Sequence, residues 1–305
     1  MLDRASTFAD DEIIALLQTK YVPVVANASH HGWLKDDESE FYRKVVFQRA
    51  DVKKGNAHQG FYIFSPDGKM VEGWNNRDPD KVKRLLKQSL ASYRSPSQVE
   101  TLKREKDRRF VGTLPPGAVV VDVFSKITQA DWPPYRDQWD ERFGKMFRES
   151  TGRDHLWITQ PEITRLARGE FPESLARRIG RYHLVDNTRG EPPFWKSNEV
   201  RASKSKVAPD RGALRVESQM TLVTNKGDRG YDADLFGYVE TKAGKLTRFD
   251  LVARGQYWGH GQYTGENAPR GKFTLAIVFT LANPKAEATK VLPQGCNDWP
   301  EYLKE

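Results

Sequence analysis

The spacing of apolar residues predicts mixed helices and strands in the first third of the chain. An amphipathic helix is expected over residues 6–21, where Thr7 is placed to cap it. The apolar run at 22–28 predicts a strand buried on both faces. A helix over 38–49, a hairpin over 61–73 and a helix that begins near Pro79 follow.

Strict alternation of apolar and polar residues begins at Ala213. It predicts strands at 214–224, 230–241, 245–259 and 272–281, joined by hairpin loops. Before them we expect a strand at 117–127 and helices at 135–149 and 161–182, the second broken near residues 169–172. The fold-class prediction is α/β plus α+β, with a first domain at 1–93, a basic linker at 94–116 and an α+β domain at 117–305. The sheet of this last domain, with strands mainly at 213–282, is expected to be an antiparallel meander or partial barrel.

The composition is that of a folded, basic protein. Of 305 residues, 38% are hydrophobic and 30% charged, with a net charge of +8. No segment is long and apolar enough to span a membrane, so we expect a soluble protein, cytoplasmic by default and periplasmic or secreted if a leader was removed. Cys296 is the only cysteine, which excludes an intramolecular disulfide and an all-cysteine zinc site. A packed thiol is the expected role of Cys296.

The first 90 residues resemble the thioredoxin-like superfamily. The matching segments are "MLDRASTFADDEIIALLQTKYVPVVAN", "GFYIFSPDGKMVEGW" and the helix that follows them, about a third of the chain. The resemblance implies a Cys-x-x-Cys pair immediately before Met1 and a cis-proline before Phe61, where this chain has Gln59 and Gly60. Without a thiolate, thiol–disulfide exchange cannot proceed, so the chain as given is expected to be redox-inactive.

The same resemblance places three histidines at the rim of the ancestral active site. His30 and His31 would emerge where the strand at 22–28 ends, and His58 would start from the same edge. Three imidazoles suit a transition metal such as zinc or copper, and one could act as a base near neutral pH. Exposed polar residues are the alternative.

The second domain offers further candidates. Tyr257, Trp258, His260 and Tyr263, amid glycines, could line the mouth of a barrel and bind a planar or sugar-like ligand, or form a turn with packed aromatic residues. Asp186 and Arg189 suit an ion pair that fixes a loop, and His183 suits a buried position with one hydrogen bond. No P-loop, GxSxG, HExxH or EF-hand motif is present.

The region 80–109 carries ten lysines and arginines against four acidic residues. Its candidate anion-binding residues are Lys83, Arg84, Lys87, Arg104 and Arg108. A solvated helix and linker is the alternative, and no RNA- or DNA-binding motif accompanies the basic residues, so we do not expect a nucleic-acid partner.

Four functional hypotheses follow, one of which is a weak anion or nucleic-acid binder that acts through residues 81–109. The leading one is protein or small-molecule binding, or scaffolding, by a redox-inactive thioredoxin-like protein. The second is a metal-binding protein or metal-dependent enzyme that uses the rim histidines. The third is a truncated oxidoreductase whose Cys-x-x-Cys lies upstream of Met1.

Overall fold

The computed structural model forms two compact units, Asp3–Val111 and Gly112–Glu305. The residues that it describes are 7–53, 59–99, 101–102, 114–136, 138–262, 264–265, 268–286, 289, 291–298 and 301–304.

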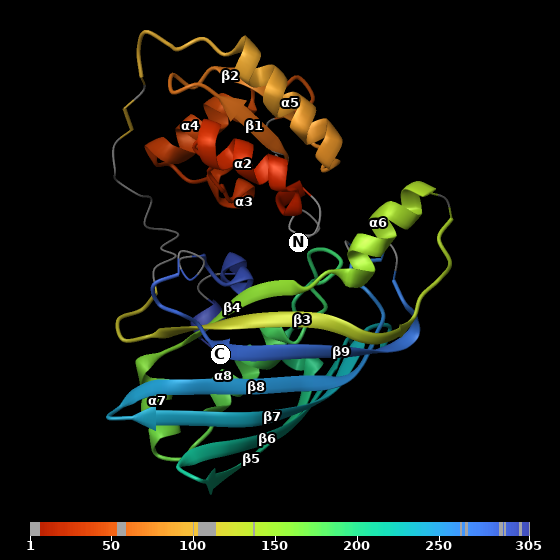
Figure 1. The fold of residues 1–305 in the computed structure, drawn as a ribbon. Helices are drawn as coiled ribbons and strands as arrows, with labels where there is room; N and C mark the ends of the chain where they lie inside the picture. Colours follow the sequence, from red (N-terminus) through yellow and green to blue (C-terminus); the bar gives the residue numbers. More distant parts are fainter. Residues whose placement is uncertain are drawn as a thin grey trace. The chain divides into compact units, whose positions relative to one another are not determined.

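The amino-terminal unit packs helices around one short hairpin (Figure 1). Its elements are the 3-10 helix η1 (Thr7–Ala9), α2 (Asp11–Lys20), α3 (Ala28–His31), α4 (Asp37–Val46), β1 (Phe61–Phe64), β2 (Met70–Trp74) and α5 (Pro79–Ser92). The predicted hairpin is confirmed, and its turn requires Gly68, which has a φ of 77°. The small core joins Ile13 of α2, Trp74 of β2 and Leu86 of α5.

Asp10, and not Thr7, caps the first long helix. Its carboxylate accepts the backbone N–H groups of Glu12 and Ile13, both at 3.1 Å. Thr7 is fully buried, and its hydroxyl donates to the carbonyl of Arg77 at 2.7 Å. The helix therefore begins four residues later than Thr7, because the residues before Asp10 form η1.

Residues 21–27 form no strand, contrary to the prediction. Val22, Val24 and Val25 are 90%, 70% and 101% exposed. A strand buried on both faces needs neighbouring strands, and the sheet of this unit, as far as it is described, consists of β1 and β2 alone. The two histidines that follow lie in the short helix α3 instead of a loop.

The carboxy-terminal unit is built on a seven-stranded antiparallel sheet that curls into a half-barrel (Figure 1). The strands lie in the order β4-β3-β9-β8-β7-β6-β5. Their bounds are β3 (Val119–Asp131), β4 (Gly152–Ile158), β5 (Val200–Asp210), β6 (Ala213–Val223), β7 (Gly230–Lys242), β8 (Lys245–Trp258) and β9 (Arg270–Leu281). The expected meander and partial barrel are confirmed.

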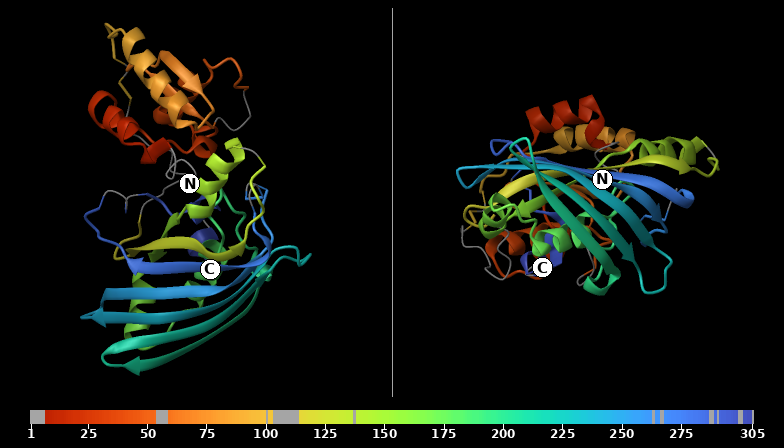
Figure 2. Two further views of the ribbon diagram at one scale, coloured as in Figure 1. Left: turned by 45° about the vertical axis from the view of Figure 1, so that its right-hand side comes forward. Right: turned by 90° about the horizontal axis from the view of Figure 1, so that it is seen from below.

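Helices fill the concave side of this sheet (Figure 2). The chain leaves β4 at one edge and reaches β5 at the other through α7 (Gln160–Ala167), α8 (Glu173–Arg178), the π-helix η2 (Ile179–His183) and η3 (Ser197–Glu199). Apolar residues of these helices and of the inner sheet face form one core. α6 (Gln138–Glu149) lies between β3 and β4, and η5 (Gln294–Asp298) and η6 (Glu301–Leu303) end the chain. Among the described helices, none has the length and apolarity needed to cross a bilayer.

Alternation in the sequence did not reveal β4 or β5. β5 is an edge strand of sequence VRASKSKVAPD, and polar residues and proline at a sheet edge discourage pairing with other chains. β4 is buried at six of its seven positions, because the carboxy-terminal segment covers its outer edge and the backbone N–H of Trp157 donates to the Tyr302 hydroxyl at 3.3 Å. Neither pattern has a period of two.

Asp10→Ala tests the observed cap. The change removes the cap and the ion pair with Lys83, so we expect the free energy of unfolding of the amino-terminal unit to fall by about 1 kcal/mol in chemical denaturation. Asp11→Ala, in the same helical turn, is the control and should have little effect. Equal losses for the two variants would contradict the assigned cap.

The stabilisation by Asp10 should also depend on pH. A hydrogen bond from Lys83 holds the pKa of the Asp10 carboxyl below its usual value of 3.8. The contribution of the Asp10 carboxylate to the free energy of unfolding is therefore complete above pH 3.8 and is lost as the pH falls below that value. The difference between the wild-type protein and Asp10→Ala should shrink between pH 7 and pH 3.

Candidate functional site: an aromatic hollow on the outer sheet face

Strand β8 ends in two aromatic residues that lie on opposite faces of the sheet. Tyr257 is 1% exposed and packs in the core against Phe273, whereas Trp258 is partly exposed on the outer face. Adjacent strand residues point to opposite faces, so these two side chains cannot line one site. Trp258 and His260 of the expected ligand set come together, and Tyr263 lies outside the described residues.

Trp258 is held firmly in place. Its indole lies over Gly230, its neighbour on β7, where a Cβ atom would collide with the ring. Its Nε1 donates to the carbonyl of Gly227 at 3.0 Å. On the β9 side, the Lys272 ammonium lies 4.3 Å from the ring centroid, a cation–π contact worth about 0.5–1 kcal/mol at an exposed site. A fixed aromatic surface therefore lies beside a positive charge.

The loop after β8 depends on two glycines. Gly259 has a φ of 76°, and a Cβ atom there would collide with the backbone of Asp228. A Cβ atom on Gly261 would collide with the ring of Pro193. Only residues without side chains let this loop approach its neighbours so closely.

This loop, the end of β8 and the start of β9 border a hollow of about 440 Å³ that is open to solvent. It is lined by Trp258, Gly259, His260, Ala268, Pro269, Gly271 and Lys272. Nδ1 of the exposed His260 lies 3.1 Å from the carbonyl oxygen of Gly261. A carbonyl oxygen only accepts, so Nδ1 carries the proton and Nε2 is the nitrogen left to interact with a ligand.

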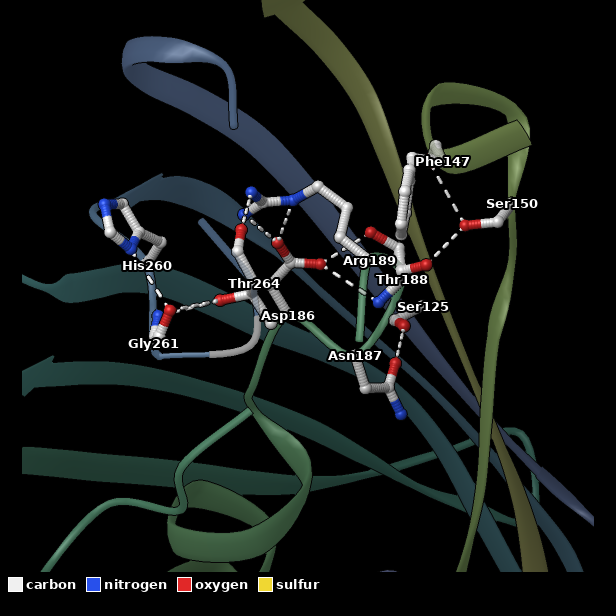
Figure 3. A network of polar contacts seen from close by, with 10 residues as sticks. All are labelled: Ser125, Phe147, Ser150, Asp186, Asn187, Thr188, Arg189, His260, Gly261 and Thr264. Carbon is white, nitrogen blue, oxygen red and sulfur yellow. Dashed lines mark hydrogen bonds and ion pairs between the residues drawn. The ribbon is translucent and has the colours of Figure 1, made fainter. Parts of the chain in front are cut away.

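A buried ion pair anchors the same loop from inside the protein (Figure 3). Arg189 and Asp186 are 2% and 1% exposed, and Nε of the arginine lies 2.9 Å from Oδ2 of the aspartate. Nη1 of Arg189 donates to the carbonyl of Thr264, whose hydroxyl accepts the N–H of Gly261 at 2.7 Å. The other oxygen of Asp186 accepts the N–H and hydroxyl of Thr188 at 3.1 and 2.6 Å. The expected ion pair is present, and through Thr264 and Gly261 it is linked to the loop that carries His260.

Further contacts tie the segment that carries this ion pair to the sheet (Figure 3). Ser125 of β3 bonds to Asn187, and the hydroxyl of Ser150 donates to the carbonyl of Thr188 at 2.5 Å. A Cβ atom on Gly152 would collide with Asn187, so β4 begins with the one residue that allows this approach.

Arg229 holds Pro193, whose ring lies against Gly261 of the loop after β8. Its guanidinium lies 3.9 Å from the ring centroid of Trp195 and donates to the carbonyl of Pro193 at 2.7 Å. Burial also raises the pKa of Tyr257, which lies near Arg229, to about 12, so the Tyr257 phenol stays neutral. Tyr257 packs on the inner face of the sheet.

A second buried cluster holds the carboxy-terminal segment. Nε2 of His183 lies 2.8 Å from the Tyr302 hydroxyl, and Nδ1 lies 3.0 Å from the Asp154 carboxylate. Burial raises the pKa of the nearby Cys296 thiol, which therefore stays protonated. All four residues are at most 6% exposed, so this cluster joins β4, η2 and the chain end and offers no surface to a substrate. His183 and Cys296 are buried, as predicted.

Of the proposed metal ligands, only the His31 side chain is described. Its Nδ1 lies 2.9 Å from the Ser39 hydroxyl, and its carbonyl accepts from Arg43 at 2.7 Å. The side chain of His30 and the whole of His58 lie outside the described residues. No group of three His, Cys, Asp or Glu residues suited to a metal occurs in the part that is described. The metal site stays a prediction.

The described part of the proposed anion site lies on α5. Lys83 and Lys87 form ion pairs with carboxylates of Asp10 and Glu12, at 3.0 and 2.5 Å, which reduces their charge available to an external anion. Arg84 is exposed. Arg104 and Arg108 lie outside the described residues.

Lys272, Gly230 and Arg229 belong to the site but were not found in the sequence. Lys272 and Gly230 matter only because register places them on either side of Trp258. Loop 259–269 separates β8 from β9, and its length hides that register from sequence reasoning.

No protein-family model, curated protein or solved structure matches the chain. The thioredoxin-like relationship therefore stays a prediction based on the sequence pattern.

Removing one member of the Asp186–Arg189 pair should strongly destabilise the carboxy-terminal unit. Arg189→Met leaves a buried carboxylate without its cation, and we expect a loss of about 3–5 kcal/mol in urea denaturation. Asp186→Asn combined with Arg189→Met should cost less than the sum of the two single changes. Arg165→Met, which breaks an exposed pair with Glu170, is the control. A loss for Arg189→Met no larger than for this control would contradict the proposed anchor.

Proposed function

We propose that the protein is a binding protein whose carboxy-terminal half-barrel holds a small anionic ligand with a flat or sugar-like body. The observation that carries the proposal is the hollow in which Trp258, Lys272 and His260 converge. A ligand is directed to this outer hollow because the concave face of the sheet is filled by the helices.

Each group has a distinct role in this proposal. Trp258 offers a flat apolar surface, on which an aromatic or sugar ring can stack. Lys272 attracts an anionic group, and no carboxylate among the described residues forms an ion pair with it. Nε2 of His260 adds a directional hydrogen bond at the rim.

The anchored loop supports binding over catalysis. The buried pair Asp186–Arg189 fixes the loop before a ligand arrives, which lowers the ordering cost of binding. His183 and Cys296, which could otherwise serve acid–base or nucleophilic chemistry, are buried away from the hollow's lining.

Ligand-observed NMR with benzoate and glucuronate, compared with the neutral probes benzyl alcohol and glucose, tests the proposal. We expect saturation transfer to the anionic probes, lost with Trp258→Ala and retained in part with Trp258→Phe. Lys272→Met should weaken binding by about tenfold, equivalent to about 1.4 kcal/mol, because it removes the attraction for the anion.

Lys245→Met is the matched control, since Lys245 is exposed at the opposite end of β8. It should leave binding unchanged. No transfer to any probe in the wild-type protein, or equal transfer in Trp258→Ala, would remove the hollow as the binding site.

A further inference from the structure

Four apolar side chains form a continuous row across the outer face of the carboxy-terminal sheet. In register, this apolar row is Phe124 on β3, Val278 on β9, Val252 on β8 and Phe236 on β7. Phe236 is 51% and Val278 39% exposed, and a hollow of about 560 Å³ lies over the row. Contiguous exposed apolar surface of this kind marks an interaction site.

Opposite charges lie at the two ends of the apolar row. Arg153 on β4 is the register partner of Phe124, and Glu217 on β6 is the partner of Phe236. From β4 to β6 the residues therefore read Arg-Phe-Val-Val-Phe-Glu, and Lys206 of the edge strand β5 follows Glu217. Within the chain Arg153 also pairs with Asp122 at 3.2 Å, and Glu217 pairs with Arg215. A second copy of this series in reverse order matches phenylalanine with phenylalanine, valine with valine and arginine with glutamate.

We propose that this face is a symmetric interface between two copies of the chain, with the two-fold axis parallel to the strands and between β8 and β9. Rotation about that axis places Phe124 opposite Phe236 of the second copy, and Arg153 opposite its Glu217. In a two-fold dimer each such contact occurs twice. Face-to-face packing of two sheets is an established way to bury apolar outer faces.

One neighbouring row agrees with the same rotation. Lys126 lies two residues after Phe124 on β3. It is in register with Ala276 on β9, Arg254 on β8 and Asp234 on β7. The rotation brings Lys126 opposite Asp234 of the second copy. In the row on the other side, Thr280 already donates its hydroxyl to Asp250 of the same chain at 3.0 Å, so that row does not distinguish the arrangement.

The charges distinguish this dimer from the other face-to-face dimer that a two-fold axis allows. A rotation axis perpendicular to the strands would place Arg153 opposite Arg153 and Glu217 opposite Glu217. Like charges across an interface are unfavourable, and opposite charges favour the first axis.

Side-chain size also suits two outward-curved sheets. The outer face of the sheet is convex (Figure 2). Two convex faces approach most closely at the middle and diverge to either side. The valines occupy the middle of the row, and the larger phenylalanines lie where extra volume is needed to maintain contact.

Sedimentation equilibrium of the full chain tests the proposal. We expect a species of twice the chain mass of 34.9 kDa. Phe236→Lys should yield monomer, because it places a charge in the apolar row, whereas Phe236→Leu should remain dimeric. A wild-type monomer at all concentrations measured, or a dimeric Phe236→Lys variant, would overturn the proposal.

Charge reversal separates this interface from other modes of dimerisation. Arg153→Glu and Glu217→Arg should each raise the dimer dissociation constant by about tenfold or more, because each places like charges together. The variant with both reversals should recover most of the wild-type affinity. Circular dichroism verifies the fold of each variant, and Glu217, which is exposed, gives the safer single change. Suppose that Glu217→Arg alone weakens the dimer and that the double reversal does not restore it. This result would refute the Arg153–Glu217 contact and with it the proposed axis.

Discussion

The alternation of side chains along the strands of the carboxy-terminal sheet is the constraint on which the other features depend. One face packs against α7, α8 and η2, and a slip of one residue in register would expose that whole face. The inner face is filled with apolar side chains, so the proposed ligand site lies on the outer face. There the same alternation places Trp258 beside Lys272 and aligns the apolar row across four strands.

The Asp186–Arg189 ion pair contributes position more than net stability. Burying two charges costs about as much as their attraction returns, so a well-packed apolar replacement could be as stable. What such a replacement lacks is the set of directed hydrogen bonds that joins Thr188, Thr264 and Gly261 in one arrangement. The buried pair thus fixes the position of the loop after β8, which forms part of the outer hollow.

Sequence reasoning succeeded where one local pattern determines the structure. The strands from β6 to β9 are eleven residues or longer, and buried and exposed positions alternate along most of their length. The apolar run at 22–28 predicted a strand wrongly, because local hydrophobicity cannot say whether neighbouring strands exist. Tyr257 and Trp258 were assigned to one site because they are adjacent, although adjacency within a strand separates them. The link from Arg189 to Thr264 spans 75 residues and has no local signature.

The most direct test of this account is hydroxyl-radical footprinting of residues 257 and 258, read by mass spectrometry at a protein concentration low enough to keep the chain monomeric. The two aromatic residues are adjacent, but Tyr257 is buried in the core whereas Trp258 is partly exposed on the outer face. It predicts that Trp258 is oxidised while Tyr257 is protected until the protein unfolds. Oxidation of Tyr257 as readily as Trp258 in the folded protein would contradict the division of the sheet into a filled inner face and a binding outer face.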